Sequence, residues 1–285
     1  MLDRMANGGS GGVAVGDVIG SYRVDAVLGE GAVGTVFRAT HVEDGTVVAL
    51  KVLKARLGAD ETYRRRFAHE ARAAQEVQHK HLVPILEAGE WDGRSFLAVA
   101  FIAGRTLEAR LEDGPLPLDE ILRLAAGVGS GLDALHAKGL IHRDVKPSNI
   151  MLNEEGSSLL TDFGLAKGPA YTVLTRPGQV VGTLDYLAPE LIKGEDASPA
   201  SDLYALGCVV YESVTGQPPF AGKGVLEIGI AHLEEEPPDP LANRPDLPAG
   251  LAWALKQALA KSPAERPPTA SAYANMLSVS ARPIR

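Results

Sequence analysis

Five groups of residues have types and spacings that suit chemistry on phosphate groups. The first is a glycine-rich segment, Gly29-Glu30-Gly31-Ala32-Val33-Gly34. Because glycine lacks a Cβ, its backbone N–H can approach a phosphate closely. A dinucleotide-binding turn would need a helix after the glycines, whereas the residues that follow alternate like a strand. A plain hairpin turn fits equally well, so this motif is weak on its own.

The second group is a lysine in a strand-like run, Val48-Ala49-Leu50-Lys51, followed by Glu70 in a helical stretch. A lone lysine in a strand is usually a solvated charge, and a lone glutamate on a helix is usually a surface residue. A pair formed by Lys51 and Glu70 would instead aim the ammonium group at phosphates. The sequence leaves both interpretations open.

The third group is a dense polar loop, His142-Arg143-Asp144-Val145-Lys146-Pro147-Ser148-Asn149. A carboxylate, a cation and an amide at this spacing suit a general base, a phosphate clamp and a metal ligand. The fourth group is Asp162-Phe163-Gly164 and the fifth is Gly182-Thr183…Ala188-Pro189-Glu190. Neither of these two means much alone.

The elements that must position these residues differ between the two halves of the chain. Strand-like runs rich in valine occupy residues 22–28, 33–40, 46–53, 83–88 and 95–101, with one helical stretch at 60–78. Beyond Gly104 the pattern is helical, at residues 118–138, 199–215, 225–233, 251–259 and 269–279. The sequence therefore predicts an α+β fold with a strand-rich first part and a helical second part.

Composition excludes several classes of protein. The chain has 285 residues, of which 45% are hydrophobic and 22% charged, with a net charge of −8. This composition supports a folded core and argues against a general nucleic-acid or membrane-surface binder. The single cysteine, Cys208, excludes an internal disulfide and fits a reducing compartment. No apolar stretch approaches the roughly 20 residues of a membrane span, so we expect a cytoplasmic chain.

All five groups occur in one order, and together they resemble the signature of eukaryotic-type (Hanks-type) Ser/Thr protein kinases, in a bacterial-like style. The resemblance covers about residues 20–280. It implies a bilobal protein-kinase-like fold with a flexible tail at 1–18, a β-rich N-lobe at 19–101 and a mostly helical C-lobe at 102–281. It also implies transfer of the γ-phosphoryl group of ATP to Ser or Thr hydroxyls of proteins, with Mg²⁺ (or Mn²⁺).

The resemblance assigns roles residue by residue. Asp144 would be the catalytic base, with Lys146 on the γ-phosphate, Lys51 on the α- and β-phosphates and Glu70 as its partner. The metal would be held by Asn149 and Asp162. The residues expected to contact ATP are Leu28, Gly29, Gly31, Gly34, Val36, Ala49, Lys51, Ala100, Ile102 and Met151.

Further matches are structural or regulatory. Glu190 would pair with Arg266, Asp202 would hold the backbone near His142 and Arg143, and Thr183 would contact the polar loop. Arg143 beside Asp144 would receive a phosphate on the loop at residues 165–181, where Thr172 and Thr175 are the candidate phosphosites, Thr175 being slightly favoured. The resemblance also implies protein substrates and allows a homodimer that phosphorylates itself in trans.

Three rival interpretations compete with this one. A pseudokinase gains no support, because Lys51, Glu70, Asp144, Asn149 and Asp162 are all present. A small-molecule phosphotransferase of the antibiotic-kinase type generally lacks the segment at residues 182–190. The interpretation as a P-loop NTPase fails, because the sequence has no GxxxxGK[ST] motif.

Overall fold

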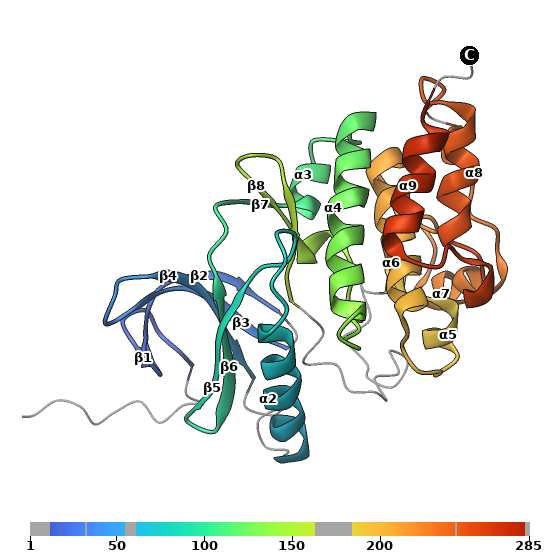
Figure 1. The fold of residues 1–285 in the computed structure, drawn as a ribbon. Helices are drawn as coiled ribbons and strands as arrows, with labels where there is room; N and C mark the ends of the chain where they lie inside the picture. The colour runs from blue at the N-terminus through green and yellow to red at the C-terminus, as the bar shows by residue number, and fades with distance from the viewer. Residues whose placement is uncertain (1–11, 32, 55–60, 163–183, 243, 283–285) are drawn as a thin grey trace, which may run out of the picture. The chain divides into compact units, whose positions relative to one another are not determined.

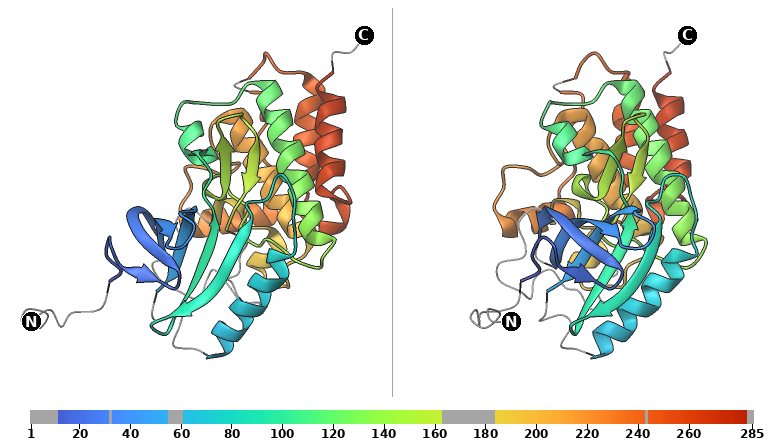
Figure 2. Two further views of the ribbon diagram at one scale, coloured as in Figure 1. Left: turned by 60° about the vertical axis from the view of Figure 1, so that its left-hand side comes forward. Right: turned by 90° about the vertical axis from the view of Figure 1, so that its left-hand side faces the viewer.

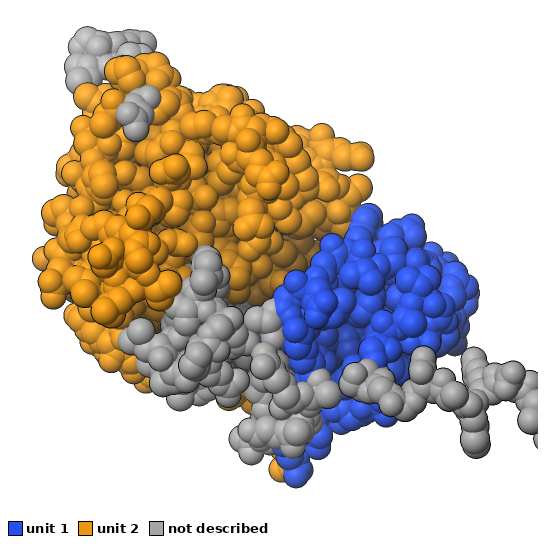
Figure 3. Space-filling view, turned by 180° about the vertical axis from the view of Figure 1, so that it is seen from behind, with its two compact units in different colours: residues 1–64, 86–101 blue, residues 65–85, 102–285 orange. Residues whose placement is uncertain are grey.

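The computed structural model describes residues 12–31, 33–54, 61–162, 184–242 and 244–282. The chain forms two compact units, which Figure 3 colours separately. Unit 1 comprises residues 1–64 and 86–101, and unit 2 comprises residues 65–85 and 102–285. The domain limits predicted from the sequence, at 18/19 and 101/102, remain predictions. None of the described helices is long and apolar enough to cross a membrane.

Unit 1 contains a six-stranded sheet with the order β1-β2-β3-β4-β6-β5 (Figure 1). The strands are β1 Val18–Ile19, β2 Tyr22–Glu30, β3 Gly34–His41, β4 Val47–Leu53, β5 Ile85–Trp91 and β6 Arg94–Ala100. Alternation decides which face is buried: Val48, Leu50 and Val52 of β4 are at most 4% exposed and pack with Phe37 and Phe96. Ala49 and Lys51 therefore point to the opposite face.

The predicted helix at 60–78 is α2, Glu61–Gln75. Phe67, Ala71 and Ala74 are buried, as their spacing predicts, while the helix ends before Val77. Most of α2, from residue 65 onward, belongs to unit 2.

Besides most of α2, the described helices of unit 2 are α3 Leu107–Leu111, α4 Leu118–His136, α5 Pro189–Ile192, α6 Pro199–Thr215, α7 Val225–Glu234, α8 Ala249–Ala258 and α9 Ala270–Ser280. Helix α4 packs against α6 and α9, and α8 packs against the same two helices. In both views of Figure 2, as in Figure 1, α4 runs beside α9. Gly129 of α4 permits this approach, because a Cβ there would lie 2.9 Å from the carbonyl oxygen of Ala270. Asp133 of α4 also accepts hydrogen bonds of 3.0 Å from the first backbone N–H groups of α9.

The limits of α6 follow from its end signals. Ser198 precedes the helix in an extended conformation, and Pro199 takes its first position, where no N–H is needed. Gly216 ends it with a φ of 85°, a conformation that glycine adopts without strain. The helix is buried almost all round, which makes it the centre of unit 2.

A small antiparallel sheet of unit 2 was not predicted. It has the order β7-β8-β9, with β7 Gly104–Thr106, β8 Ile150–Asn153 and β9 Ser158–Leu160. The strands are only three or four residues long, too short for a clear alternation. The sheet matters because β8 starts at the end of the polar loop and β9 ends just before Asp162.

Candidate active site

Asp144 is held by two side chains of its own loop. Its Oδ2 lies 3.2 Å from Lys146 Nζ and accepts a hydrogen bond of 3.0 Å from Asn149 Nδ2. The same amide nitrogen donates to the backbone carbonyl of Asp144 at 2.8 Å. The side chain of Asp144 keeps 15% of its surface exposed. The result is an oriented carboxylate that a substrate can still reach, next to a cation.

A buried carboxylate fixes the backbone of the polar loop. Asp202 of α6 is 2% exposed and accepts hydrogen bonds of 2.8 Å from the backbone N–H groups of His142 and Arg143. His136 Nε2 also lies 2.8 Å from its Oδ2. Arg143 has a φ of 64°, which costs a non-glycine residue about 1–3 kcal/mol. Asp202 therefore holds the loop in a conformation that the chain alone disfavours.

His142 joins the polar loop to the end of β9. Its Nδ1 accepts a 3.3 Å hydrogen bond from the backbone N–H of Asp144, so its Nε2 carries the proton and donates to the Thr161 carbonyl at 3.1 Å. The ring is fully buried, and this burial lowers its pKa. His142 is therefore a neutral spacer.

Asn149 and Asp162 lie at the same end of the β8–β9 pair, because the backbone N–H of Thr161, the neighbour of Asp162, donates to the Asn149 carbonyl at 3.0 Å. The Asn149 amide nitrogen is used by Asp144, which leaves its Oδ1 as the available acceptor. Asp162 adopts a φ of 59°, a strained conformation of the kind found at functional sites. A carboxylate and an amide oxygen fit Mg²⁺, which typically takes one or two protein ligands and completes its shell with phosphates and water.

Glu70 of α2 reaches the same loop. Its Oε1 lies 3.3 Å from Arg143 Nη1, with side-chain exposures of 20% and 25%. The sequence did not indicate this contact. The expected pairing of Glu70 with Lys51 joins the two units and stays a prediction, as does the role of Arg143 as a phosphate receiver.

Val36, Ala49 and Lys51, three of the residues expected around a nucleotide, share one face of the sheet in unit 1. Val36 pairs directly with Lys51 across β3 and β4, and Ala49 lies two residues before Lys51 on the same face. The three glycines of the glycine-rich segment, Gly29, Gly31 and Gly34, differ in their surroundings. A Cβ at Gly34 would lie 2.3 Å from the Val52 carbonyl oxygen, so the fold itself requires glycine there.

Gly29 and Gly31 have no such internal reason to be glycine. A Cβ at Gly29 would meet nothing within 4 Å, and one at Gly31 only the Gly34 carbonyl at 3.8 Å. Open space over these two positions suits the approach of a ligand to the backbone. Leu28 is 49% exposed, and Ala100 ends β6 just before Ile102. Met151 lies in unit 2, on β8 opposite Leu159.

The structure contains the contact expected between Glu190 and Arg266. Arg266 Nη1 and Nη2 donate to the two carboxylate oxygens of Glu190 at 2.7 and 2.8 Å, and the two side chains are 0% and 5% exposed. Burial alone would raise the pKa of Glu190, but the hydrogen bonds and charge of Arg266 hold it below its usual value. Thr183, Thr172 and Thr175 lie outside the described residues.

Comparison with known proteins gives one consistent answer. A family model described as "Protein kinase domain" matches residues 22–276. The chain is 40% identical over 267 residues to the serine/threonine-protein kinase pkn3 of Myxococcus xanthus. The aligned region covers 88% of this chain and 48% of that protein. The chain is 38% identical over 252 residues to PknE of Mycobacterium tuberculosis, with 88% and 44% covered. It therefore spans less than half the length of these relatives.

Solved structures agree with the sequence relatives. The crystal structure of the Mycobacterium tuberculosis PknI kinase domain is similar with a TM-score of 0.77 and 32% sequence identity. The similarity covers 95% of this chain and all of that one.

Proposed function

The chain belongs to the protein kinase family as a bacterial-type serine/threonine protein kinase domain, and we propose that Asp144, Lys146, Asn149, Asp162 and Lys51 carry its phosphoryl transfer. The observation that supports this most directly is the hydrogen-bonded group of Asp144, Lys146 and Asn149 in one loop. Phosphoryl transfer needs alignment and charge neutralisation more than covalent chemistry, and this group supplies both.

In this proposal each residue of the loop has a separate task. Asp144 accepts the proton of the Ser or Thr hydroxyl, and its orientation is kept by Asn149. Lys146, 3.2 Å from Asp144, neutralises charge on the transferred phosphoryl group. When bound to Asn149 and Asp162, Mg²⁺ (or Mn²⁺) would supply further neutralisation of the phosphate oxygens.

ATP would be held by the exposed face of the sheet in unit 1. We propose that Gly29 and Gly31, with open space above them, give phosphates access to backbone N–H groups. Lys51 contacts the α- and β-phosphates and is oriented by Glu70. Adenine would contact the apolar residues Leu28, Val36, Ala49 and Met151 and the backbone of Ala100 and Ile102, with Gly34 shaping the loop.

Regulation follows from the cation beside the base. We propose that phosphorylation of Thr175 or Thr172, by a second copy of the chain within a homodimer, supplies a phosphate to Arg143. Thr183 would contact the polar loop near Asp144. Since the activity consumes ATP and needs no disulfide, we place it in the cytoplasm, with proteins as substrates.

The test compares radiolabel transfer from [γ-³²P]ATP by the wild type, Asp144→Asn and a matched control, Asp92→Asn. Asp92 lies in the β5–β6 turn with a φ of 48°, a conformation that asparagine tolerates. We expect D144N to lose about 10²–10⁴-fold in rate while it still binds ATP, and D92N to match the wild type. Equal transfer by D144N would remove Asp144 from the mechanism. ATP binding without transfer by any protein would favour the pseudokinase interpretation.

A further inference from the structure

His232 on α7 has a buried nitrogen atom without a partner, outside the candidate active site. The side chain is fully buried, and its Nδ1 lies 2.9 Å from the hydroxyl oxygen of Tyr204 on α6. Its Nε2 is buried as well, but no group of the described residues lies within hydrogen-bonding geometry of it. Buried polar groups of folded proteins are nearly always paired, so the position of Nε2 requires an explanation.

Packing and hydrogen bonds hold the ring of His232 in one orientation. The rings of Tyr204 and Phe220 meet it edge-on, with their centroids 5.7 and 4.9 Å away. Lys261 Nζ donates to the backbone carbonyls of Ala231 and His232 at 3.0 and 2.9 Å, which fixes the last turn of α7. The direction of Nε2 is therefore set by the fold.

The backbone of Asp185 approaches the same ring from a second element. Asp185 belongs to a short 3₁₀ helix, η3, Leu184–Tyr186, which packs against α7. Burial and the charge of Lys261 lower the pKa of His232 to about 3, whereas the Asp185 backbone acts in the opposite direction. A group that favours the protonated ring is an acceptor, so this backbone group is the carbonyl of Asp185. Because Nδ1 already pairs with Tyr204, the carbonyl faces Nε2.

The tautomer of His232 suits this carbonyl. With a pKa of about 3 the ring is neutral near neutral pH, so it carries one proton. When the Tyr204 hydroxyl donates to Nδ1, that proton is on Nε2 and can be donated to Asp185. The opposite tautomer would place a lone pair against a carbonyl oxygen and is therefore disfavoured. Nε2–H is thus a donor that faces η3 and lacks only a closer approach.

Helix η3 belongs to the fifth sequence motif, the one that small-molecule phosphotransferases generally lack. Two other residues of this motif are anchored to the rest of unit 2. The Tyr186 hydroxyl donates to Glu212 on α6 at 2.6 Å, and Glu190 is held by Arg266. A hydrogen bond from the buried histidine to Asp185 would add a third anchor, near the start of the described part of this motif.

We propose that His232 is a positioning residue for protein substrates. Binding of a polypeptide against residues 184–190 brings the Asp185 carbonyl within reach of Nε2–H, and this hydrogen bond holds η3 in place. Because the ring is fully buried, it touches neither ATP nor the hydroxyl that receives the phosphoryl group. This inference rests on the proposed function, since a kinase that acts on proteins is the kind of enzyme that gains from a fixed η3.

Two substitutions of His232 separate its two hydrogen bonds. Asparagine retains an acceptor near the position of Nδ1 but has no donor at the position of Nε2. Glutamine carries its amide N–H farther out, near the position of Nε2. We expect His232→Asn to raise KM for a protein substrate about five- to tenfold, and His232→Gln to stay within about twofold of the wild type.

The assay measures transfer of label from [γ-³²P]ATP to dephosphorylated casein by the full chain. Hydrolysis of ATP in the absence of casein and the KM for ATP are measured beside it, because neither involves a bound polypeptide. Both should be the same in H232N and the wild type. The milder variant Tyr204→Phe removes the hydroxyl that selects the tautomer and keeps the aromatic ring, so it should raise KM for casein about threefold even where H232N fails to fold.

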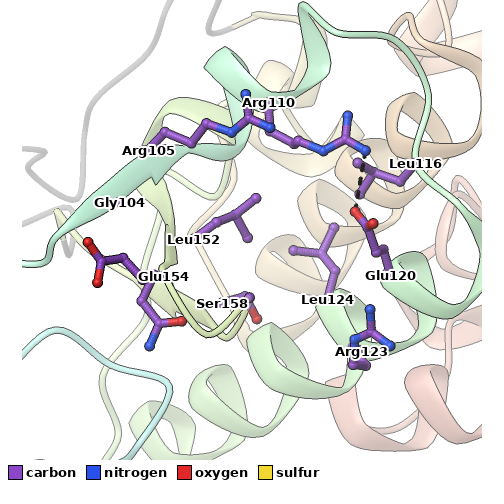
Figure 4. Close-up of a pocket in the computed structure, with 12 residues that line it drawn as sticks. Gly104, Arg105, Arg110, Leu116, Glu120, Arg123, Leu124, Leu152, Glu154 and Ser158 are labelled. Carbon is purple, nitrogen blue, oxygen red and sulfur yellow. Dashed lines mark hydrogen bonds and ion pairs between the residues drawn. The ribbon is translucent and has the colours of Figure 1, made fainter.

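Ser158→Ala is the matched control. Ser158 is 3% exposed, and its Oγ also has no partner among the described residues. It lies on the wall of a cavity between α3, α4 and the β8–β9 pair (Figure 4). Loss of this hydroxyl should leave KM for casein within about twofold of the wild type.

The outcomes distinguish failure of the positioning role from failure of the proposed function. Equal KM for casein in H232N and the wild type would overturn the proposal while the kinase activity stands. Equal losses in H232N and H232Q, or a parallel loss of ATP hydrolysis, would assign His232 to the fold alone. Hydrolysis of ATP without label on casein or on the chain itself would mean that the proposed function fails instead.

Discussion

The buried pair of Glu190 and Arg266 allows a quantitative prediction. The guanidinium donates to both carboxylate oxygens at 2.7 and 2.8 Å, Ser201 Oγ donates to one of them at 2.8 Å, and Arg266 lies 4.8 Å from the centre of the Tyr204 ring. Changing Glu190 to Met leaves the guanidinium buried with only backbone carbonyls as partners. Removal of one partner of such a pair costs about 3–5 kcal/mol.

Replacing both partners should cost much less than the two single changes together. Because two desolvated charges are lost at once, apolar residues of similar volume often leave stability nearly unchanged. We therefore expect Glu190→Met and Arg266→Met to lower the free energy of unfolding by about 3–5 kcal/mol each, and the double variant to recover at least half of the summed loss. The exposed pair of Lys223 and Glu235, 2.5 Å apart, is the control and should show a coupling below about 1 kcal/mol.

The assay must report on unit 2 alone. The chain has two tryptophans, Trp91 in unit 1 and Trp253 on α8, so a Trp91→Phe background leaves Trp253 as the fluorescent probe of unit 2. Urea unfolding is measured in this background for the parent, Glu190→Met, Arg266→Met and the double variant, and these four free energies of unfolding form a double-mutant cycle. Single losses below 1 kcal/mol, or a double variant equal to the sum of the singles, would refute the argument that the pair acts as one buried unit.

Three further predictions concern charges at other places in unit 2. Burial raises the pKa of Glu212 to about 7. Ionisation of this carboxyl group therefore destabilises the fold progressively as the pH rises from 4.5 to 7, and by a constant amount above pH 7. Glu212→Gln, which keeps an acceptor for the Tyr186 hydroxyl, should raise the melting temperature at pH 8 but not at pH 4.5. Burial lowers the pKa of His232 to about 3, so stability should fall as the pH decreases from 6.5, and His232→Asn should flatten that fall in an acid titration. Arg143→Gln removes the ion pair with Glu70 and the proposed phosphate receiver. Phosphatase treatment should therefore slow phosphoryl transfer by the wild type but leave the rate of the variant unchanged. A variant that phosphatase treatment still slows would contradict this role.

Much of the fold could be predicted because its signals are local. Alternation in β4 identified the buried face with Leu50 and the opposite face with Lys51, and Ser198, Pro199 and Gly216 gave the limits of α6. The short strands β7, β8 and β9 have no such signal, since each is fixed by its neighbours rather than by its own three or four residues. The motif residues of the candidate site are proposed from their order along the chain, and the roles of Thr172, Thr175 and Thr183 stay predictions.

The resemblance predicted the contact of Asp202 with the backbone near His142 and Arg143, and the structure contains it. Two further supports of the site could not be found from the sequence, because each joins residues that are far apart along the chain. His136 and Asp202 are 66 residues apart, and Glu70 and Arg143 are 73 apart. The periodicity of a helix does not indicate from which distant donor a carboxylate will accept a hydrogen bond. The strained conformation of Arg143, which Asp202 fixes by accepting hydrogen bonds from two consecutive N–H groups, is likewise visible only in the folded loop.

The backbone and the side chain of Arg143 have different partners, so the regulatory role proposed for this arginine would leave the neighbouring Asp144 undisturbed. The backbone of Arg143 is fixed by Asp202, whereas its side chain contacts Glu70 and stays one-quarter exposed. A phosphate on the guanidinium, as proposed above, would change the partner of Glu70 and would leave in place the Asp202 hydrogen bond that fixes the φ of 64°. The carboxylate that would orient Lys51 and the cation that would receive a phosphate are thus coupled by one ion pair. Under the proposed roles, a change of charge at Arg143 would reach Lys51 through Glu70, while Asp144 keeps its contacts with Lys146 and Asn149.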